Sequence, residues 1–307
     1  MVQKVLLLYG GYSAEREVSI SAKNDIAAAL QQNGYLVIEH DLTDTWRFLD
    51  ILRQEKPDVV YNGLYGNWGE DGEIQALLDM LQIPYTHSNM LASAIGMNKN
   101  LTKLIAAQSG IKIAPGEYKT AGKYLTEGTK IPYPYVIKPT SDGSSVGIFI
   151  VKSDSDRKKV HYDNPNLKIM IEKYIEGREL TVMCLEGKAH VVTELKPKNE
   201  FYDYEAKYTD GFTQHILPAD LPETVTQTCL KYSETIHKAL GCGILSRSDF
   251  RYNPHDGVVF LEINTNPGMT SLSLVPEQAK YIGISFADLC GKIVHNASYR
   301  QINLCIK

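Results

Sequence analysis

Glu262-Ile263-Asn264-Thr265-Asn266-Pro267-Gly268-Met269 is the most informative segment of this chain, because its partner Gly243-Ile244-Leu245-Ser246-Arg247-Ser248-Asp249-Phe250-Arg251 lies one hairpin upstream. Both segments have the alternating, β-branched or aromatic character of strands. The residues between them, Asn253-Pro254-His255-Asp256-Gly257, are rich in turn formers. The sequence therefore predicts an antiparallel hairpin, with its turn centred between His255 and Asp256.

This pairing brings four polar side chains to one face of the hairpin. Asp249 lies opposite Glu262, and Arg247 lies opposite Asn264, because antiparallel partners are equally distant from the turn. The two-residue period of a strand then directs all four side chains to the same side. The other side takes residues that we expect to pack, namely Ser248, Phe250, Leu261 and Ile263. This separation of polar from apolar side chains indicates a functional site.

Asp249, Glu262 and Asn264 form a candidate magnesium site. Two carboxylates and an amide oxygen, with no Cys or His among them, are hard ligands that suit Mg²⁺, which keeps its other positions for water and substrate phosphates. Arg247 beside them can hold a developing anion. Two alternatives stay open. The hairpin can be a surface element with ordinary cross-strand charge pairing, and a one-residue bulge would break the assumed register.

The length and composition of the chain favour small-molecule chemistry. Its 307 residues exceed what one hydrophobic core usually requires, so we expect two or three domains. A net charge of −4 and the lack of a long Lys/Arg run argue against nucleic acid or an anionic membrane as a partner. Five cysteines without disulfide or zinc spacing fit a reducing cytosol. The apolar run 5–8 is too short for a signal peptide or a membrane span, so we expect a soluble, cytoplasmic protein.

The N-terminal part of the chain alternates strands with helices, which predicts an open α/β domain. Gly10-Gly11-Tyr12 forms the first strand-to-helix turn, and Ser13 is expected to cap the following helix. A ligand should sit where this turn meets the loop 65–72. The dinucleotide fingerprint is absent, which disfavours a nicotinamide cofactor and favours a substrate that carries a carboxylate. The turn can equally be a tight connection without function. The elements expected here are strands at 5–9, 35–40 and 58–64 and helices at 13–32 and 73–81.

A second unit begins near Met97, with a helix that extends to about Gly110. The strand 133–138 runs into the Gly/Ser-rich loop 139–147, whose backbone N–H groups can cover phosphates while Lys138 and Lys99 supply positive charge. The loop is not a Walker A motif, and such loops are often only turns. Further along, residues 170–175 form a strand that ends in an extended segment. The backbone of this segment can form hydrogen bonds with the edge of an adenine base. The segment 154–166 is expected to be an exposed polar insertion.

Phe201-Tyr202-Asp203-Tyr204-Glu205-Ala206-Lys207-Tyr208 has neither helical nor strand periodicity. Aromatic residues interleaved with charges in a loop suggest a lid over a ligand, with Lys207 and Tyr208 as candidate contacts. A loop that packs on itself is the alternative.

These signals occur in one order, and by them the chain resembles the D-alanine:D-alanine ligases of the ATP-grasp superfamily over nearly its whole length. The residues that carry the resemblance are 10–19, Gly69-Glu70-Asp71-Gly72, Lys138-Pro139 with 143–147, the lid 201–208, and Glu262 through Ser273-Leu274. The resemblance implies three α/β domains, at 1–96, 97–177 and 178–307, with ATP held between the second and third.

The resemblance also implies roles for individual residues. The nucleotide-binding positions are Lys99, Lys138, Ser144, Glu172, Lys173, Tyr174, Ile175, Glu179 and Lys207. The Mg²⁺ ligands are Asp249, Glu262 and Asn264, in agreement with the hairpin. Arg247 and the backbone of Gly268 hold the reacting carboxylate. Glu15, Ser144 and Tyr208 form a hydrogen-bonded set that meets the ammonium of the first D-alanine, and Ser273 and Leu274 contact the second.

The implied reaction joins two D-alanines through an acyl phosphate, releases ADP and phosphate, and serves peptidoglycan synthesis and thereby the cell wall and cell shape. It uses ATP and two Mg²⁺ ions, for which Mn²⁺ can substitute, together with a monovalent cation in some members. A homodimer is also implied. Three positions depart from the family pattern. Tyr65 replaces a His and is expected to bind and orient substrate by hydrogen bonding, while Asn98 for Asp and His87 for Gly look structural.

Other functions remain open at this point. A different ATP-grasp carboxylate-amine ligase would share the magnesium hairpin but would have no reason to carry Tyr208 and Ser273-Leu274. A catalytically silent nucleotide-binding module would have no need of the intact set around Arg247 and Asp249. A nicotinamide oxidoreductase is the weakest alternative, because its fingerprint is absent.

Overall fold

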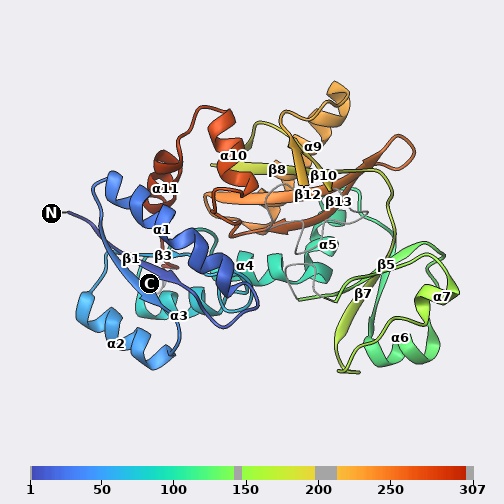
Figure 1. Cartoon of the computed structure of the whole chain (residues 1–307), viewed down its shortest axis with the longest axis horizontal. Helices are drawn as coiled ribbons and strands as arrows, with labels where there is room; N and C mark the ends of the chain where they lie inside the picture. The colour runs from blue at the N-terminus through green and yellow to red at the C-terminus, as the bar shows by residue number, and fades with distance from the viewer. Residues whose placement is uncertain (1, 142–146, 198–212, 302–307) are drawn as a thin grey trace, which may run out of the picture.

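The computed structural model describes residues 2–141, 147–197 and 213–301, which fold into three β-sheets with helices packed around them (Figure 1). The N-terminal sheet lies at one end of the molecule and a four-stranded sheet at the other. A six-stranded sheet lies between them (Figure 1). Within the described residues, no helix combines the length and the apolar character that crossing a membrane requires.

The N-terminal sheet is parallel, with strand order β2-β1-β3, as expected for an open α/β unit. Its elements are β1 (Lys4–Tyr9), α1 (Arg16–Gln32), β2 (Leu36–Asp41), α2 (Thr45–Glu55), β3 (Val59–Asn62) and α3 (Glu73–Leu81). The sequence prediction left out α2, which Asp44 caps by accepting from the amides of Trp46 and Arg47. The prediction that Ser13 caps the first helix is wrong, because α1 begins two residues later, after Glu15.

The four-stranded sheet is antiparallel, with strand order β4-β7-β5-β6. It consists of β4 (Gly116–Thr120), β5 (Tyr135–Pro139), β6 (Phe149–Val151) and β7 (Lys168–Lys173), with α6 (Ala121–Glu127) and α7 (Asp154–Arg157) beside them. Its own small core includes Tyr124, Ile137 and Ile171. The predicted polar insertion at 154–166 begins with α7 and lies mostly at the surface, with Val160 buried in this core.

The six-stranded sheet has the order β11-β10-β8-β12-β13, and β9 pairs with β8. Its strands are β8 (Arg178–Leu185), β9 (Lys188–Ala189), β10 (Thr193–Pro197), β11 (Thr213–Ile216), β12 (Leu245–Asn253) and β13 (Gly257–Asn264). The helices packed around it are α4 (Met90–Met97), α5 (Lys99–Gln108), α9 (Glu223–Leu240) and α10 (Leu274–Tyr281). Alternation along β8 directs Leu180 and Val182 into the core with α9, and Met183 and Leu185 into a second core.

That second core joins the two ends of the chain. Helix α11 (Phe286–His295) packs against α1, and one buried cluster contains Val5, Ile26, Met183, Leu245 and Ile293. Because apolar burial of this extent is shared by both sheets, the N-terminal sheet is fixed relative to the six-stranded sheet. Loops from the two sheets can therefore build one site.

Candidate active site

The hairpin of β12 and β13 has the pairing that the sequence predicted for its polar face. Arg247 lies opposite Asn264, and Asp249 lies opposite Glu262. The predicted centre of the turn, between His255 and Asp256, is wrong by half a residue. Asn253 pairs with Gly257, so the turn is centred on His255. A bulge after Asp249 absorbs this difference, so the register of the polar pairs is kept.

The bulge changes the packing face of the hairpin. Phe250 is opposite Phe260, and their rings meet edge to face with centroids 5.9 Å apart. The prediction that Leu261 packs on this face is therefore wrong. Leu261 instead lines the pocket described below, while Phe260 takes its place in the core.

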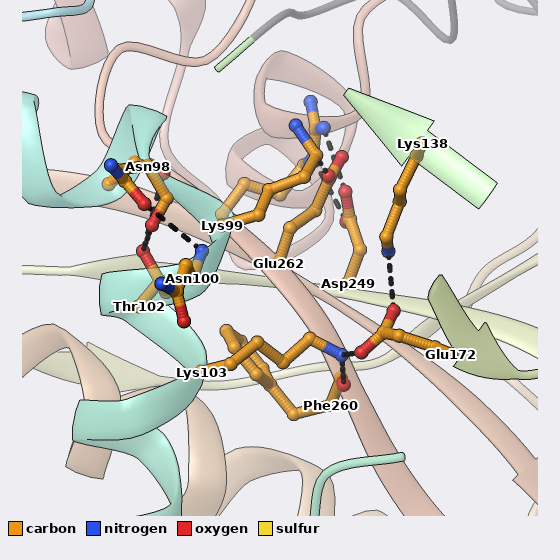
Figure 2. Close-up of polar contacts among 12 residues, drawn as sticks. Asn98, Lys99, Asn100, Thr102, Lys103, Lys138, Glu172, Asp249, Phe260 and Glu262 are labelled. Atoms are coloured by element: carbon orange, nitrogen blue, oxygen red, sulfur yellow. Dashed lines mark hydrogen bonds and ion pairs between the residues drawn. The ribbon is translucent and has the colours of Figure 1, made fainter. Parts of the chain in front are cut away.

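The oxygen groups of the predicted metal site each have a polar or charged neighbour. Both carboxylate oxygens of Asp249 accept from Arg247, at 3.1 and 2.9 Å, and one also accepts from the hydroxyl of Thr181 at 2.6 Å. Glu262 lies 3.6 Å from the ammonium nitrogen of Lys99 (Figure 2). The side-chain oxygen of Asn264 accepts from the amide of Asn266. The chain thus neutralises both carboxylates with its own cations.

A pocket lies beside this hairpin, with walls from both the four-stranded and the six-stranded sheets. Six of the predicted nucleotide-binding residues line it, and so do two of the predicted metal ligands. These residues are Lys138, Glu172, Lys173, Tyr174, Ile175 and Glu179, with Asp249 and Glu262. Apolar side chains of Ala114, Val136, Ile148 and Leu261 complete much of the wall. A pocket whose wall combines apolar side chains with several charged groups suits a nucleotide base with its phosphates.

Glu172, which lines the pocket, pairs with two lysines (Figure 2). Its Oε2 lies 2.9 Å from Nζ of Lys138, and its Oε1 lies 2.6 Å from Nζ of Lys103. Burial opposes the charge of Glu172, but the two ammonium groups outweigh it and lower the pKa of this carboxyl. Burial likewise opposes the charge of Lys138, but the carboxylates of Glu172 and Glu262 raise its pKa above the ordinary value. Both groups are therefore held in their charged forms.

Two charged residues near the pocket were missed by the sequence prediction. Lys103 is 2% exposed, and its ammonium also donates to the backbone oxygen of Phe260. Arg251 lines the pocket and pairs with Glu179 at 2.9 Å. A signal for Lys103 existed, because it lies four residues after Lys99 on one helix and hence on the same face.

The predicted adenine-binding segment follows β7 along the pocket wall. The amide of Lys173 donates to Pro115, and that of Tyr174 donates to Pro134, so these two N–H groups are already used. The side chain of Lys173 reaches the turn of the β12–β13 hairpin, where it pairs with Asp256 at 2.9 Å. This segment therefore ties the two sheets together beside the pocket.

The N-terminal loops contribute a second group of residues. The side chain of Glu15 is buried, and the hydroxyl of Ser13 accepts from the amide of Glu15 and donates to the carbonyl of Tyr65. Gly66 has a φ of +70°, and a Cβ there would lie 3.2 Å from a carboxylate oxygen of Glu15. Glycine suits this position, because the backbone is left-handed and a side chain would crowd Ser13 and Glu15. Burial, together with the carboxylate of Glu15, raises the pKa of the nearby Glu70 well above its usual range.

The loop after β13 meets the same region. The hydroxyl of Tyr65 accepts from the amide of Met269 at 3.0 Å, which links the loop 65–72 to Gly268. Ser273 accepts from the amide of Thr270 and lies just before α10. Leu274, the first residue of α10, is 6% exposed. The three predicted residues Ser144, Lys207 and Tyr208 lie outside the described residues.

Two departures from the family pattern have local explanations. Asn98 caps α5 by accepting from the amides of Asn100 and Leu101, and Asn and Asp are equally good caps (Figure 2). His87 has a φ of 71° and is buried against the ring of Tyr61. Histidine tolerates this backbone conformation better than most residues that carry a Cβ. Asn98 therefore acts as a helix cap, and His87 packs in the interior.

A pocket between an antiparallel four-stranded sheet and a second sheet, with buried lysines and paired carboxylates, defines an enzyme of the ATP-grasp class. The family model described as D-ala D-ala ligase C-terminus matches residues 111–295. The D-alanine–D-alanine ligase of Dinoroseobacter shibae is 44% identical to the chain over 299 residues, which cover 96% of each protein. The chain belongs to the D-alanine–D-alanine ligase family.

Solved structures agree with this assignment. The crystal structure of D-alanine–D-alanine ligase from Bacillus anthracis has a TM-score of 0.84 and 33% identity, covering 96% of this chain and 97% of that one. The structure of the Bacillus anthracis enzyme complexed with ATP has a TM-score of 0.82 and 32% identity over the same shares. The ATP-grasp fold expected from the sequence is thereby confirmed.

Proposed function

We propose that the chain ligates two D-alanines to D-alanyl-D-alanine with ATP, through an acyl phosphate. The observation that supports this most directly is the pocket in which Lys138 and Glu172 face the paired carboxylates of Asp249 and Glu262. Family membership supplies the choice of substrate.

The nucleotide occupies the pocket between the two sheets. Its base lies along the apolar wall near Tyr174 and Ile175, and Glu179 receives the ribose hydroxyls. Its phosphates extend toward Lys138 and Lys99, whose positive charges attract and neutralise the negative polyphosphate. The enzyme of Bacillus anthracis has been solved with ATP, which favours this use of the pocket.

Asp249, Glu262 and Asn264 would hold Mg²⁺. Their fit rests on the donor set: two carboxylates paired across the hairpin and an amide oxygen on the same face, all of them hard oxygen ligands. Bound Mg²⁺ would neutralise the phosphates and the charge that develops during phosphoryl transfer. We propose two such ions, for which Mn²⁺ can substitute, together with a monovalent cation.

The substrates are activated in sequence. A carboxylate is a poor acylating agent, so an oxygen of the first D-alanine attacks the γ-phosphorus of ATP, and the bond to ADP breaks. The amine of the second D-alanine then attacks the acyl carbon, loses a proton, and expels phosphate. Glu15 would hold the first ammonium, and Lys207 would help Lys138 to neutralise the phosphoryl group.

Arg247 and the backbone N–H of Gly268 would stabilise the oxyanion of the tetrahedral intermediate. Loss of one such donor typically lowers the rate roughly 10²–10³-fold. Both Asp249 oxygens accept from Arg247 in this structure, which holds the guanidinium beside the predicted metal ligands. Ser144 and Tyr208 would orient Glu15, Tyr65 would position the Gly268 loop, and Ser273 and Leu274 would contact the second D-alanine.

The cellular setting follows from the reaction. We propose that the product enters peptidoglycan precursor synthesis in the cytoplasm, where ATP is available, and that the enzyme acts as a homodimer. We also propose units at 1–96, 97–177 and 178–307, since each of the three sheets lies within one of these ranges. Analytical ultracentrifugation tests the dimer, and limited proteolysis tests the boundaries.

The deciding experiment is mass spectrometry of the products from ATP, MgCl₂ and D-alanine. We expect D-alanyl-D-alanine, ADP and phosphate in equal amounts. Nucleotide binding without phosphate release would instead support a silent nucleotide-binding module. Phosphate release without the dipeptide would indicate another carboxylate-amine ligase.

A further inference from the structure

Lys103 is a buried cation that the proposed reaction does not use. It lies on α5 and is absent from the walls of the pocket, whereas its partner Glu172 lines them. Its ammonium contacts Glu172 on β7 at 2.6 Å and the backbone oxygen of Phe260 on β13 at 3.0 Å (Figure 2). A single side chain thus joins a helix to both of the sheets that form the pocket.

Stability alone does not explain this residue. Taking an ammonium and a carboxylate out of water costs about as much as their attraction returns, and apolar side chains of similar volume often serve as well. Lys103 is 2% exposed and Glu172 is 3% exposed, so both are fully removed from water. A role in the geometry or charge of the pocket is the better explanation.

The contacts indicate that role. Each oxygen of Glu172 has its own lysine, Oε1 with Lys103 and Oε2 with Lys138. Two ammonium groups and one carboxylate leave this buried set with a net positive charge. Without Lys103, Glu172 would pair with Lys138 alone and would no longer be held from its other side, so a polyanionic ligand would meet a neutral pair.

Lys99 strengthens the same arrangement. It lies one turn before Lys103 on α5 and reaches Glu262, at 3.6 Å, on β13. Lys103 fixes α5 against Phe260, two residues before Glu262 on the same strand. The orientation of α5 therefore determines the positions of two ammonium groups, that of Lys99 beside Glu262 and that of Lys103 beside Glu172.

We propose that Lys103 is a positioning residue for the nucleoside triphosphate: it holds Glu172 in place, so that Lys138 keeps its position and its net charge for the phosphates. This inference rests on the proposed function, because it assigns the pocket to a nucleotide. Lys103 itself touches no substrate atom in this scheme.

The test is a double-mutant cycle with Lys103→Met and Glu172→Gln, in the full-length chain. ATP binding is measured by calorimetry with Mg²⁺ and without D-alanine, and ligation is measured separately as kcat and KM. We expect Lys103→Met to weaken ATP binding about tenfold or more, as the loss of partners that orient binding groups typically does. The kcat at saturating ATP and the KM for D-alanine should stay close to those of the wild type.

The cycle separates positioning from general effects. In a chain that already carries Glu172→Gln, the added Lys103→Met change should no longer weaken ATP binding, because its partner is gone. The same loss in both backgrounds would mean that Lys103 acts on ATP through its charge or through folding, and the proposal would be overturned. Lys123→Met, an exposed charge removal on α6, is the matched control and should bind ATP like the wild type.

Two further outcomes are informative. Lys103→Gln removes the same charge but keeps a polar group at the end of the side chain. If Lys103→Met does not fold, Lys103→Gln is used in its place, and the same weakening of ATP binding is expected. Wild-type affinity in the folded variant would refute the positioning role while leaving the proposed function intact. A wild-type chain that binds no ATP would refute the proposed function itself.

Discussion

His87 should make the protein sensitive to acid. Its ring is buried, and burial lowers its pKa to about 3. One ring nitrogen, Nδ1, contacts the hydroxyl of Thr86 at 3.0 Å, while Nε2 has no hydrogen-bond partner among the described residues. Protonation would place a donor without an acceptor, and a charge, in the interior.

The sign and size of the effect follow from linkage. Below pH 6.5 the unfolded chain protonates this histidine, while the folded chain does not until about pH 3, so stability is lost as the pH falls through this window. At pH 4.5 the difference amounts to two pKa units, or about 2.7 kcal/mol at 1.36 kcal/mol per unit. Above pH 7.5 the contribution is close to zero.

The perturbation is His87→Asn, because asparagine tolerates the left-handed backbone but does not titrate. Urea unfolding of the wild type and the variant is measured from pH 4.5 to 7.5. The variant loses packing against Tyr61, so its stability at pH 7.5 should be lower; the prediction concerns the slope. Between pH 7.5 and 4.5 the variant should lose about 2–3 kcal/mol less than the wild type.

A matched control is His161→Asn, which changes an exposed histidine and should keep the wild-type slope. Equal pH slopes for wild type and His87→Asn would refute the reasoning, because they would mean that the buried ring takes up its proton as readily as an unfolded one.

Three other predictions concern the reaction. Asp249→Asn and Glu262→Gln should each nearly abolish phosphate release without unfolding the chain, since an amide keeps the shape but loses the charge that attracts Mg²⁺; near-normal turnover at ordinary Mg²⁺ concentration would contradict the metal assignment. Tyr65→Phe leaves the amide of Met269 without its acceptor, which should lower stability by about 1–3 kcal/mol and reduce activity by a factor that is constant from pH 6 to 8; a new or lost ionisation in the rate profile would count against this. Tyr208→Phe should keep ATP binding but raise the ratio of D-alanyl-D-lactate to D-alanyl-D-alanine when the two acceptors compete, most clearly at low pH; an unchanged ratio in chromatography from pH 6 to 9 would remove this residue from the choice of acceptor.

The sequence by itself determined the hairpin that carries the polar pairs. The two-residue period of strands and the turn formers at 253–257 are local signals, so they predicted that Asp249 faces Glu262 before any tertiary information was used. The order of motifs along the chain then identified the family, which the comparisons confirmed.

Local signals did not suffice where packing decides. The bulge after Asp249, which moves Leu261 from the core to the pocket, is a feature of how the two strands pair. Just before α1, which begins after Glu15, the hydroxyl of Ser13 donates to the carbonyl of Tyr65, which is distant in sequence. Neither the bulge nor this hydrogen bond can be predicted from residues that are neighbours in the sequence.

Only the tertiary structure decided how charges are shared in the pocket. Lys103, Lys138 and Glu172 come from a helix and two strands, and no spacing in the sequence says that one carboxylate serves two lysines. The energy of a buried charge depends on every group within a few ångströms, and those groups come from distant parts of the chain. The residue types at the site were therefore predictable from the sequence, whereas the partners that set their charge and position required the fold.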